Sequence, residues 1–417
     1  METCNGDETD NPILVRRDDE VISEAKWNGF KLCGDNIDKT VKPRNMTISK
    51  QSQSFNYFNS YAVLDRIDMS LCSEEAPLID LEPDMGSILP SNDNKLSIIR
   101  NMAVLVARIL VKNISFFKLH FEDAVEYHIK HKFTKEMSTK SEVVNLGIYL
   151  HSERSYDEFL QILDKLEKYI PKKIVEHDGL MREVHHQVLL GGDQMTAARA
   201  RGSKMIRMNS TTDSKRLTGL LPVSEDWHTK VILLEIIWKR LYSTVSITDH
   251  GTLQQLRNLI NRRNVVSDPK KDVNATEDFL NLVTTSYVLC VAMQKLKMKE
   301  IDSSPSVDVL DIGNTKEERK EWIITFSEEI ASEYVDLSTF NSDRKIDPED
   351  HVYEYAKEMI SLGLFYMEYH DAIREGDGDR VFNCWKYMLI MFRATSHWNY
   401  ALEAFTLLAQ YHWILPE

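Results

Sequence analysis

The chain has 417 residues, a formal net charge of −14 and 42% hydrophobic residues, so it can bury a large core and divide into more than one lobe. No run approaches the roughly 20 uncharged apolar residues that a membrane span needs. The N-terminus is acidic and polar, unlike a secretory signal, and the 5 cysteines lack zinc-site or disulfide spacing. We therefore expect an intracellular protein with reduced thiols and no membrane partner.

Three regions follow one another along the chain. Residues 1–25 are polar and are predicted to be disordered. Residues 26–222 mix strand-like and helical patterns, and residues 223–417 are almost wholly helical. The strand candidates are residues 28–35, 55–68, 143–151 and 184–192. This order predicts an α/β, helix-rich protein, in which a mixed α/β core with a helical insertion precedes a helical region that completes the core.

Helices are predicted where apolar residues recur at three- and four-residue spacing. Residues 93–114 have this spacing, and Ser155-Tyr156-Asp157-Glu158 forms a capping box before the apolar stripe of Phe159, Ile162, Leu163 and Leu166. The helix candidates of the second half are residues 225–245, 252–263, 276–299, 316–335, 348–370, 380–393 and 399–412. We expect the helices from 224 onward to pack as an insertion.

Two aspartates follow strand candidates in the same local pattern. "KLCGDN" and "LLGGDQ" each run apolar residues into Gly-Asp-amide, at Asp35 and Asp193. Open α/β sheets place ligand groups at such strand ends, and paired carboxylates can hold Mg²⁺ or Mn²⁺. The alternative for Asp35 is a turn, which the residues alone favour, and the alternative for Asp193 is a helix N-cap. A Walker-type phosphate loop is excluded, because the required glycine spacing is missing.

Basic residues follow Asp193 with no acid between them: Arg199, Arg201, Lys204 and Arg207. Arginine forks match phosphate oxygens, so this cluster suits a nucleic-acid backbone, and we take Arg199, Arg201 and Arg207 as substrate-binding candidates. The alternative is a solvated helix face that balances the excess of acids.

Glu403 and His228 are further candidates on predicted helices. Glu403 is the only charged residue in "NYALEAFTLLAQYHW", and a lone buried carboxylate must be paired, protonated or bound to metal. An ion pair with Arg393 is the alternative to a metal role. His228 could orient a substrate or act as an acid or base, although a single histidine is more often a packing or capping residue.

Several motifs resemble a multicopy eukaryotic family of domains of unknown function that looks transposon-derived. The most specific is "GGDQMTAARARG", and "DWHTK" and "LRNLINRRNVV" accompany it. The resemblance runs from about Asp35 to the C-terminus. It implies a transposase-like chain with a ribonuclease-H-like mixed sheet interrupted by large α-helical insertions.

In such a fold the first catalytic acid ends the first strand, the second ends the fourth strand, and the third lies on a late helix. The resemblance therefore implies catalytic roles for Asp35, Asp193 and Glu403, a metal bound by Asp35 and Asp193, and DNA as the partner in the nucleus. Relatives continue past residue 417, so a further acid-bearing helix is expected beyond it and this copy is expected to be truncated and inactive.

Two functions follow from these observations. The first is a metal-dependent enzyme of DNA strand transfer, or its degenerate copy. The second is a non-enzymatic protein whose helical half binds protein partners or a second copy of the chain. Clustering of Asp35 with Asp193 in the folded chain discriminates between them.

Overall fold

A computed structural model of the chain describes residues 29–48, 51–68, 84–177, 180–306, 311–340 and 350–414. The segment 1–25, predicted to be disordered, lies outside the described residues. The chain divides into two compact units, the first made of residues 1–72 and 139–225 and the second of residues 73–138 and 226–417. The second junction falls close to the expected boundary at 222/223. The helical segment before residue 139, expected as part of the core region, belongs instead to the second unit.

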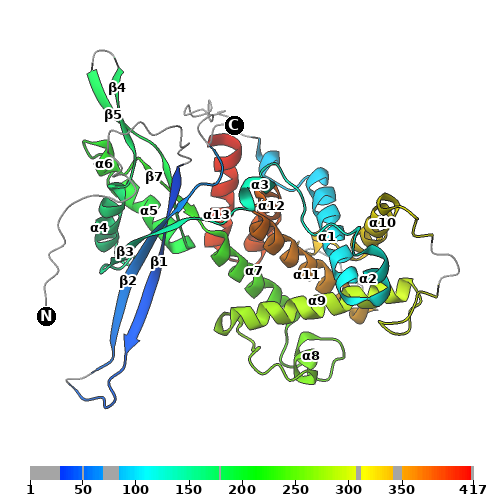
Figure 1. Cartoon of the computed structure of the whole chain (residues 1–417). Helices are drawn as coiled ribbons and strands as arrows, with labels where there is room; N and C mark the ends of the chain where they lie inside the picture. The colour runs from blue at the N-terminus through cyan, green and yellow to red at the C-terminus, as the bar shows by residue number, and fades with distance from the viewer. Residues whose placement is uncertain are drawn as a thin grey trace. The chain divides into compact units, whose positions relative to one another are not determined.

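The first unit is built on a mixed five-stranded sheet of order β3-β2-β1-β6-β7 (Figure 1). Its strands are β1 (Phe30–Val41), β2 (Gln53–Leu64), β3 (Val143–Tyr149), β6 (Val188–Gly192) and β7 (Leu220–Ser224). β2 is antiparallel to β1 and β3, whereas β6 is parallel to β1 and β7. Pairing of Leu32 with Leu190 and of Cys33 with Gly191 confirms the predicted joining of residues 30–35 to 187–192.

A second, two-stranded sheet consists of β4 (Lys172–His177) and β5 (Leu180–His185). The strand predicted over residues 184–192 was therefore wrong in one respect. β5 ends at His185, and β6 begins separately at Val188. Only the second of these strands enters the main sheet.

One face of the main sheet is covered by α4 (Tyr156–Glu167) and α5 (Gln194–Ile206), and the short α6 (Asp213–Arg216) precedes β7. The predicted apolar stripe of α4 is buried against Leu32 and Phe58 of the sheet. Burial of one such side chain contributes about 2 kcal/mol. The predicted capping box is not formed by Ser155, whose side chain makes no capping bond. Glu158 instead accepts a hydrogen bond of 2.6 Å from the backbone N of Ser152.

The second unit is helical and is packed around large buried side chains that include Trp238, Phe279, Tyr366 and Trp385. No helix among the described residues is both long and apolar enough to cross a membrane. The α-helices of the second unit are α1 (Asn92–Asn113), α2 (Ser115–Phe121), α3 (Thr134–Met137), α7 (Asp226–Leu241), α8 (Leu253–Leu259), α9 (Val273–Lys295), α10 (Lys316–Tyr334), α11 (His351–Glu375), α12 (Gly378–Ala394) and α13 (Trp398–Ala409). Short turns of other helix types are η1 (Met85–Ile88), η2 (Pro269–Lys271), η3 (Leu337–Phe340) and the π-helical η4 (Gln410–Ile414).

Candidate functional site

Asp35 lies on β1, and Asp193 directly follows β6, the strand that pairs with β1 in parallel. The β1–β6 pairing ends with Cys33 beside Gly191. Continuing that register by two residues sets Asp35 beside Asp193, where β6 has ended and α5 begins. The repeated Gly-Asp pattern of the sequence therefore marks neighbouring positions in the sheet.

Asp35 is not in a turn, so the interpretation that its local sequence alone favoured was wrong. β1 continues through Asp35 to Val41, and Asp35 pairs with Asn59 in the antiparallel ladder with β2. Its carboxylate oxygen Oδ1 accepts a hydrogen bond of 2.8 Å from the backbone N of Asn36. Asp35 thus lies within a long strand, just past the point where parallel pairing stops.

The glycines before the two aspartates permit close packing. A Cβ at Gly34 would lie 2.1 Å from the ring of Phe58, and one at Gly192 would lie 2.5 Å from Cγ2 of Thr196. A Cβ at Gly191 would lie 2.0 Å from a carboxylate oxygen of Glu225. A side chain at Gly34 would press on β2, and one at Gly192 would press on the first turn of α5, whereas the flexible end of Glu225 could move away from Gly191. Gly34 and Gly192 therefore allow the close packing around the two acids.

Asp193 is the N-cap of α5. Its Oδ1 accepts a hydrogen bond of 2.7 Å from the backbone N of Thr196. This is the alternative role that the sequence left open for Asp193, and it satisfies one of the unpaired amides of the first helical turn. The capping bond also fixes the direction of the Asp193 carboxylate beside β1.

Glu153, which the sequence patterns did not single out, joins the two aspartates. It lies in the loop between β3 and α4 and is fully buried. Its Oε1 accepts a hydrogen bond from Nδ2 of Asn36, and its Oε2 accepts one from the Thr196 hydroxyl. A continuous chain of hydrogen bonds thus runs from Asp35 through Asn36, Glu153 and Thr196 to Asp193. We call Asp35, Glu153 and Asp193 the acidic cluster.

The environment of Glu153 favours its protonated form. Burial, together with the charges of Asp193 and Asp35, raises the pKa of Glu153 to about 7, against the opposing hydrogen bonds from Thr196 and Asn36. Both aspartates therefore lie within electrostatic range of Glu153. Their charges disfavour the ionised form of Glu153, and a bound cation would oppose that effect.

A different acid occupies the neighbouring end of β7. Glu225 forms an ion pair of 3.1 Å with Lys31 and accepts a weak hydrogen bond of 3.8 Å from the thiol of Cys33. Burial and the charge of Glu225 raise the pKa of the Cys33 thiol to about 12. Cys33 is therefore unreactive as a nucleophile, and the Glu225 carboxylate is committed to Lys31.

The acidic cluster offers oxygen ligands, which suit a hard divalent cation. Within the described ranges, no group of three or more His, Cys, Asp or Glu side chains is arranged so that all could bind one metal ion. Mg²⁺ commonly uses only one or two carboxylates and completes its shell with water and phosphate oxygens. Asp35 and Asp193 fit that requirement, and the nearby buried Oδ1 of Asn36 has no hydrogen-bond partner.

The basic residues of α5 are partly used inside the first unit. Arg207 forms a double hydrogen bond with the Asp164 carboxylate on α4, one arm of which is 2.7 Å long. The Arg199 guanidinium stacks on the ring of Tyr156 at 4.5 Å, and the Lys204 ammonium donates to the carbonyl of Leu220 at 2.5 Å. Arg207 therefore ties α5 to α4, and its guanidinium is committed to Asp164.

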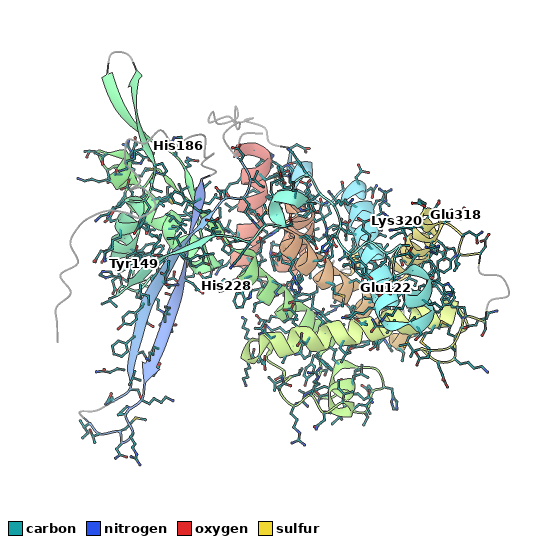
Figure 2. The ribbon with its side chains drawn as sticks, viewed as in Figure 1. Glu122, Tyr149, His186, His228, Glu318 and Lys320 are labelled. Carbon is teal, nitrogen blue, oxygen red and sulfur yellow. The ribbon has the colours of Figure 1, made fainter. Side chains whose placement is uncertain are left out.

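Glu403 and His228 belong to the second unit and are not part of the acidic cluster in the first. Glu403 lies on α13 and is buried, with 3% of its surface exposed. The proposed ion-pair partner Arg393 stacks on the ring of Trp398 at 3.8 Å. His228 lies in the first turn of α7 (Figure 2). Its ring is edge-on to that of Trp227, with the ring centroids 4.8 Å apart.

Two acids of the second unit, the buried Glu368 and the partly buried Asp226, are held by basic or aromatic partners. Glu368 accepts two hydrogen bonds from Arg380, of 2.9 and 2.6 Å, and Arg380 also reaches Asp371 at 2.8 Å. Burial raises the pKa of Glu368 even so. Asp226 accepts hydrogen bonds from the Tyr369 hydroxyl at 2.8 Å and the Trp385 indole at 3.0 Å. These contacts join helices and are structural.

Comparison with known proteins identifies one family. The profile of the Family of unknown function (DUF6589) matches residues 82–417. That range includes Glu153 and Asp193 but begins after the strand that carries Asp35. No curated protein and no solved structure matches the chain.

Proposed function

The chain belongs to this family of unknown function, and we propose from the acidic cluster of its first unit that it is a transposase-like protein acting on DNA phosphodiesters. One observation carries the proposal. Asp35 on β1 and Asp193 at the end of the adjacent parallel β6 both act electrostatically on the buried Glu153. Acids brought together from three separate segments are typical of sites that bind divalent cations and phosphates.

The topology of the main sheet supports a ribonuclease-H-like fold. Taken in chain order, β6 is the fourth strand of this sheet, and it joins β1 in parallel on the side opposite β2. Asp35 lies on the first strand and Asp193 directly follows the fourth. A helix lies between the third and fourth strands and another between the fourth and fifth. Asp193 therefore has the placement that the resemblance implied for the second acid, whereas Asp35 lies within the first strand and not at its end.

Asp35 and Asp193 would hold Mg²⁺ or Mn²⁺ through their carboxylate oxygens. A bound ion of this kind supplies Lewis acidity to the phosphodiester and to its attacking water. Asp193 can cap α5 through one oxygen and present the other, because a carboxylate has several acceptor sites. Asp35 remains exposed on its strand and is open to a substrate.

Glu153 acts as a positioning residue in this proposal. It is fully buried and contacts Asn36 and Thr196, so it links the strand of Asp35 to the helix capped by Asp193. Arg199 and Arg201, each about two turns beyond Asp193 on α5, would contact the DNA backbone. Such contacts position the nucleic acid without reading its sequence.

Nicking of supercoiled plasmid DNA tests the proposed function. Incubation of the full chain with Mg²⁺ or Mn²⁺ should convert supercoiled plasmid to the open circle, and Asp35→Asn and Asp193→Asn should each abolish the conversion. Arg207→Ala is the control, because Arg207 is held by Asp164. Nicking that persists in both Asn variants would exclude the acidic cluster as the active site.

The alternative is a non-enzymatic interaction protein, whose partners would be other proteins or a second copy of the chain. The observation that favours it is the structural use of the acids, since Asp193 caps α5 and each carboxylate oxygen of Glu153 accepts a hydrogen bond. On this alternative the folded chain neither binds Mn²⁺ at Asp193 nor nicks DNA, while Asp193→Asn leaves its fold unchanged.

A further inference from the structure

β1 and β2 extend well beyond the rest of the main sheet. The pairing of β1 with β6 ends at Cys33, and the pairing of β2 with β3 begins at Phe58. Beyond these points β1 and β2 pair only with each other, as far as Val41 and Gln53. We call residues 37–48 and 51–57 the distal hairpin, and Figures 1 and 2 show it projecting from the first unit.

A two-stranded hairpin of this kind gains little stability from packing. One of its faces nevertheless carries large side chains. Because side chains alternate along a strand, Ile37 and Lys39 of β1 share a face with their partners Tyr57 and Phe55 of β2. The rings of Phe55 and Tyr57 are 5.9 Å apart. We call these four residues the hairpin strip.

The hairpin strip is continuous with the acidic cluster. Asp35 and its partner Asn59 are the next pair along the same face, beside Ile37 and Tyr57. From Asp35 to Lys39 the strand rises by about 14 Å. An extended ligand on the strip would therefore reach Asp35 from one side without crossing any other strand.

The distal hairpin is basic in an acidic protein. Residues 39–64 contain four lysines and arginines and no acid, although the chain carries 65 acidic residues. Lys39, Lys42 and Arg44 are exposed, and no ion pair within the described part of the chain holds them. The acid nearest in sequence, Asp38, is paired with Arg154 at 2.7 Å. The positive charges of the hairpin are therefore available to a polyanion.

We propose that the hairpin strip binds a single strand of DNA and delivers it to Asp35. Nucleic-acid bases stack on aromatic rings such as those of Phe55 and Tyr57, and Lys39, opposite Phe55, would neutralise a phosphate. An acidic ligand without rings would use Lys39 but not the aromatic pair. This inference rests on the proposed function only in naming Asp35 as the destination, because strand binding itself requires no metal.

Binding of a fluorescent 20-nucleotide oligothymidine to the full chain in EDTA tests the proposal. Because EDTA removes the metal, the assay measures DNA binding by the hairpin strip alone and does not depend on whether the protein nicks DNA. Tyr57→Ala should weaken binding about tenfold, and Tyr57→Phe, which keeps the ring, should bind as the wild type does. Lys39→Ala should lower the slope of log affinity against log salt by about 0.7.

Matched controls lie in the second unit. Tyr127→Ala and Lys299→Ala remove an exposed tyrosine and an exposed lysine there and should leave binding unchanged. Circular dichroism of each variant shows whether the hairpin is still folded, so that unfolding can be told from the loss of a DNA contact. Tyr57→Phe serves as the folded reference, because it keeps the ring and the strand.

Absence of binding by the wild type, or equal affinity of Tyr57→Ala and Tyr57→Phe, would overturn the proposal. The proposal would also be overturned if the protein sedimented with phosphatidylserine vesicles, and if Tyr57→Ala and Lys39→Ala abolished this sedimentation but left DNA binding intact. Strand binding through the strip without metal-dependent nicking would sustain this inference and reject only the proposed function.

Discussion

The hydroxyl of Thr196 donates a hydrogen bond to the buried Glu153 carboxylate, while the backbone N of Thr196 donates to Asp193. One threonine in the first turn of α5 therefore holds two acids at once. Asn36 plays the matching part on β1, since its Nδ2 donates to Glu153 and its backbone N to Asp35. Glu153 is the link between the two halves of the acidic cluster, and its protonation should govern the stability of the first unit.

Stability should fall as pH rises through the titration of Glu153. Its folded-state pKa of about 7 lies above the ordinary value of 4.5, so the folded state binds the proton more tightly. The contribution of this tighter proton binding to the free energy of unfolding is complete below pH 4.5. It is lost as pH rises through 7, which lowers the free energy of unfolding by about 3 kcal/mol. Glu153→Gln should remove this dependence and be more stable than the wild type at pH 8.

Urea unfolding of both proteins at about pH 5.5 and about pH 8, on either side of the folded-state pKa, measures this effect. The amide introduced by Glu153→Gln can still accept from Thr196, and a flipped Asn36 can accept from that amide through its unpartnered Oδ1. Equal pH dependence in wild type and Glu153→Gln would show that Glu153 is ionised throughout.

Asp193 should tolerate asparagine but not alanine. Asparagine caps a helix about as well as aspartate, so Asp193→Asn should change the free energy of unfolding by only a few tenths of a kcal/mol. Asp193→Ala removes the acceptor of the Thr196 N–H and should cost about 1 kcal/mol. Thermal unfolding of the two variants checks the difference. Equal stability would mean that the capping bond contributes nothing.

Gly34 should be intolerant of alanine. The added Cβ would meet the Phe58 ring, which is fully buried and cannot move freely, so Gly34→Ala should cost about 1–3 kcal/mol. Gly378→Ala is the control, because no atom lies within 4 Å of a Cβ there. Chemical denaturation compares the two. A Gly34→Ala protein as stable as Gly378→Ala would contradict the close packing of β1 on β2.

The ion pairs of the second unit should contribute differently to the free energy of unfolding, according to how deeply they are buried. Arg380→Met leaves the fully buried Glu368 without its main partner and should cost about 3–5 kcal/mol. Arg240→Met breaks an exposed pair with Glu358 and should cost less than about 1 kcal/mol. Denaturant unfolding of both variants decides the point, and comparable losses would contradict it.

The pairing of β1 with β6 was predictable because its signal is local. In both strands an apolar run ends in Gly-Asp, so the strands and their acids could be recognised together. β7 was missed because Pro222 interrupts it, yet β7 is an edge strand, where proline is tolerated. Glu153 carries no local signal, because its burial arises only when α5 packs beside its loop. The division into units was also obscured, since the helices before residue 139 pack with partners far away in the sequence.

Calorimetric titration with Mn²⁺ tests most directly whether Asp35 and Asp193 together hold a divalent cation. Wild type and Asp193→Asn should share the same fold, because asparagine preserves the cap. We predict saturable Mn²⁺ binding by the wild type and its loss in Asp193→Asn and Asp35→Asn, with Asp164→Asn binding as the wild type does. Equal Mn²⁺ affinity in wild type and Asp193→Asn would contradict a metal site at the acidic cluster.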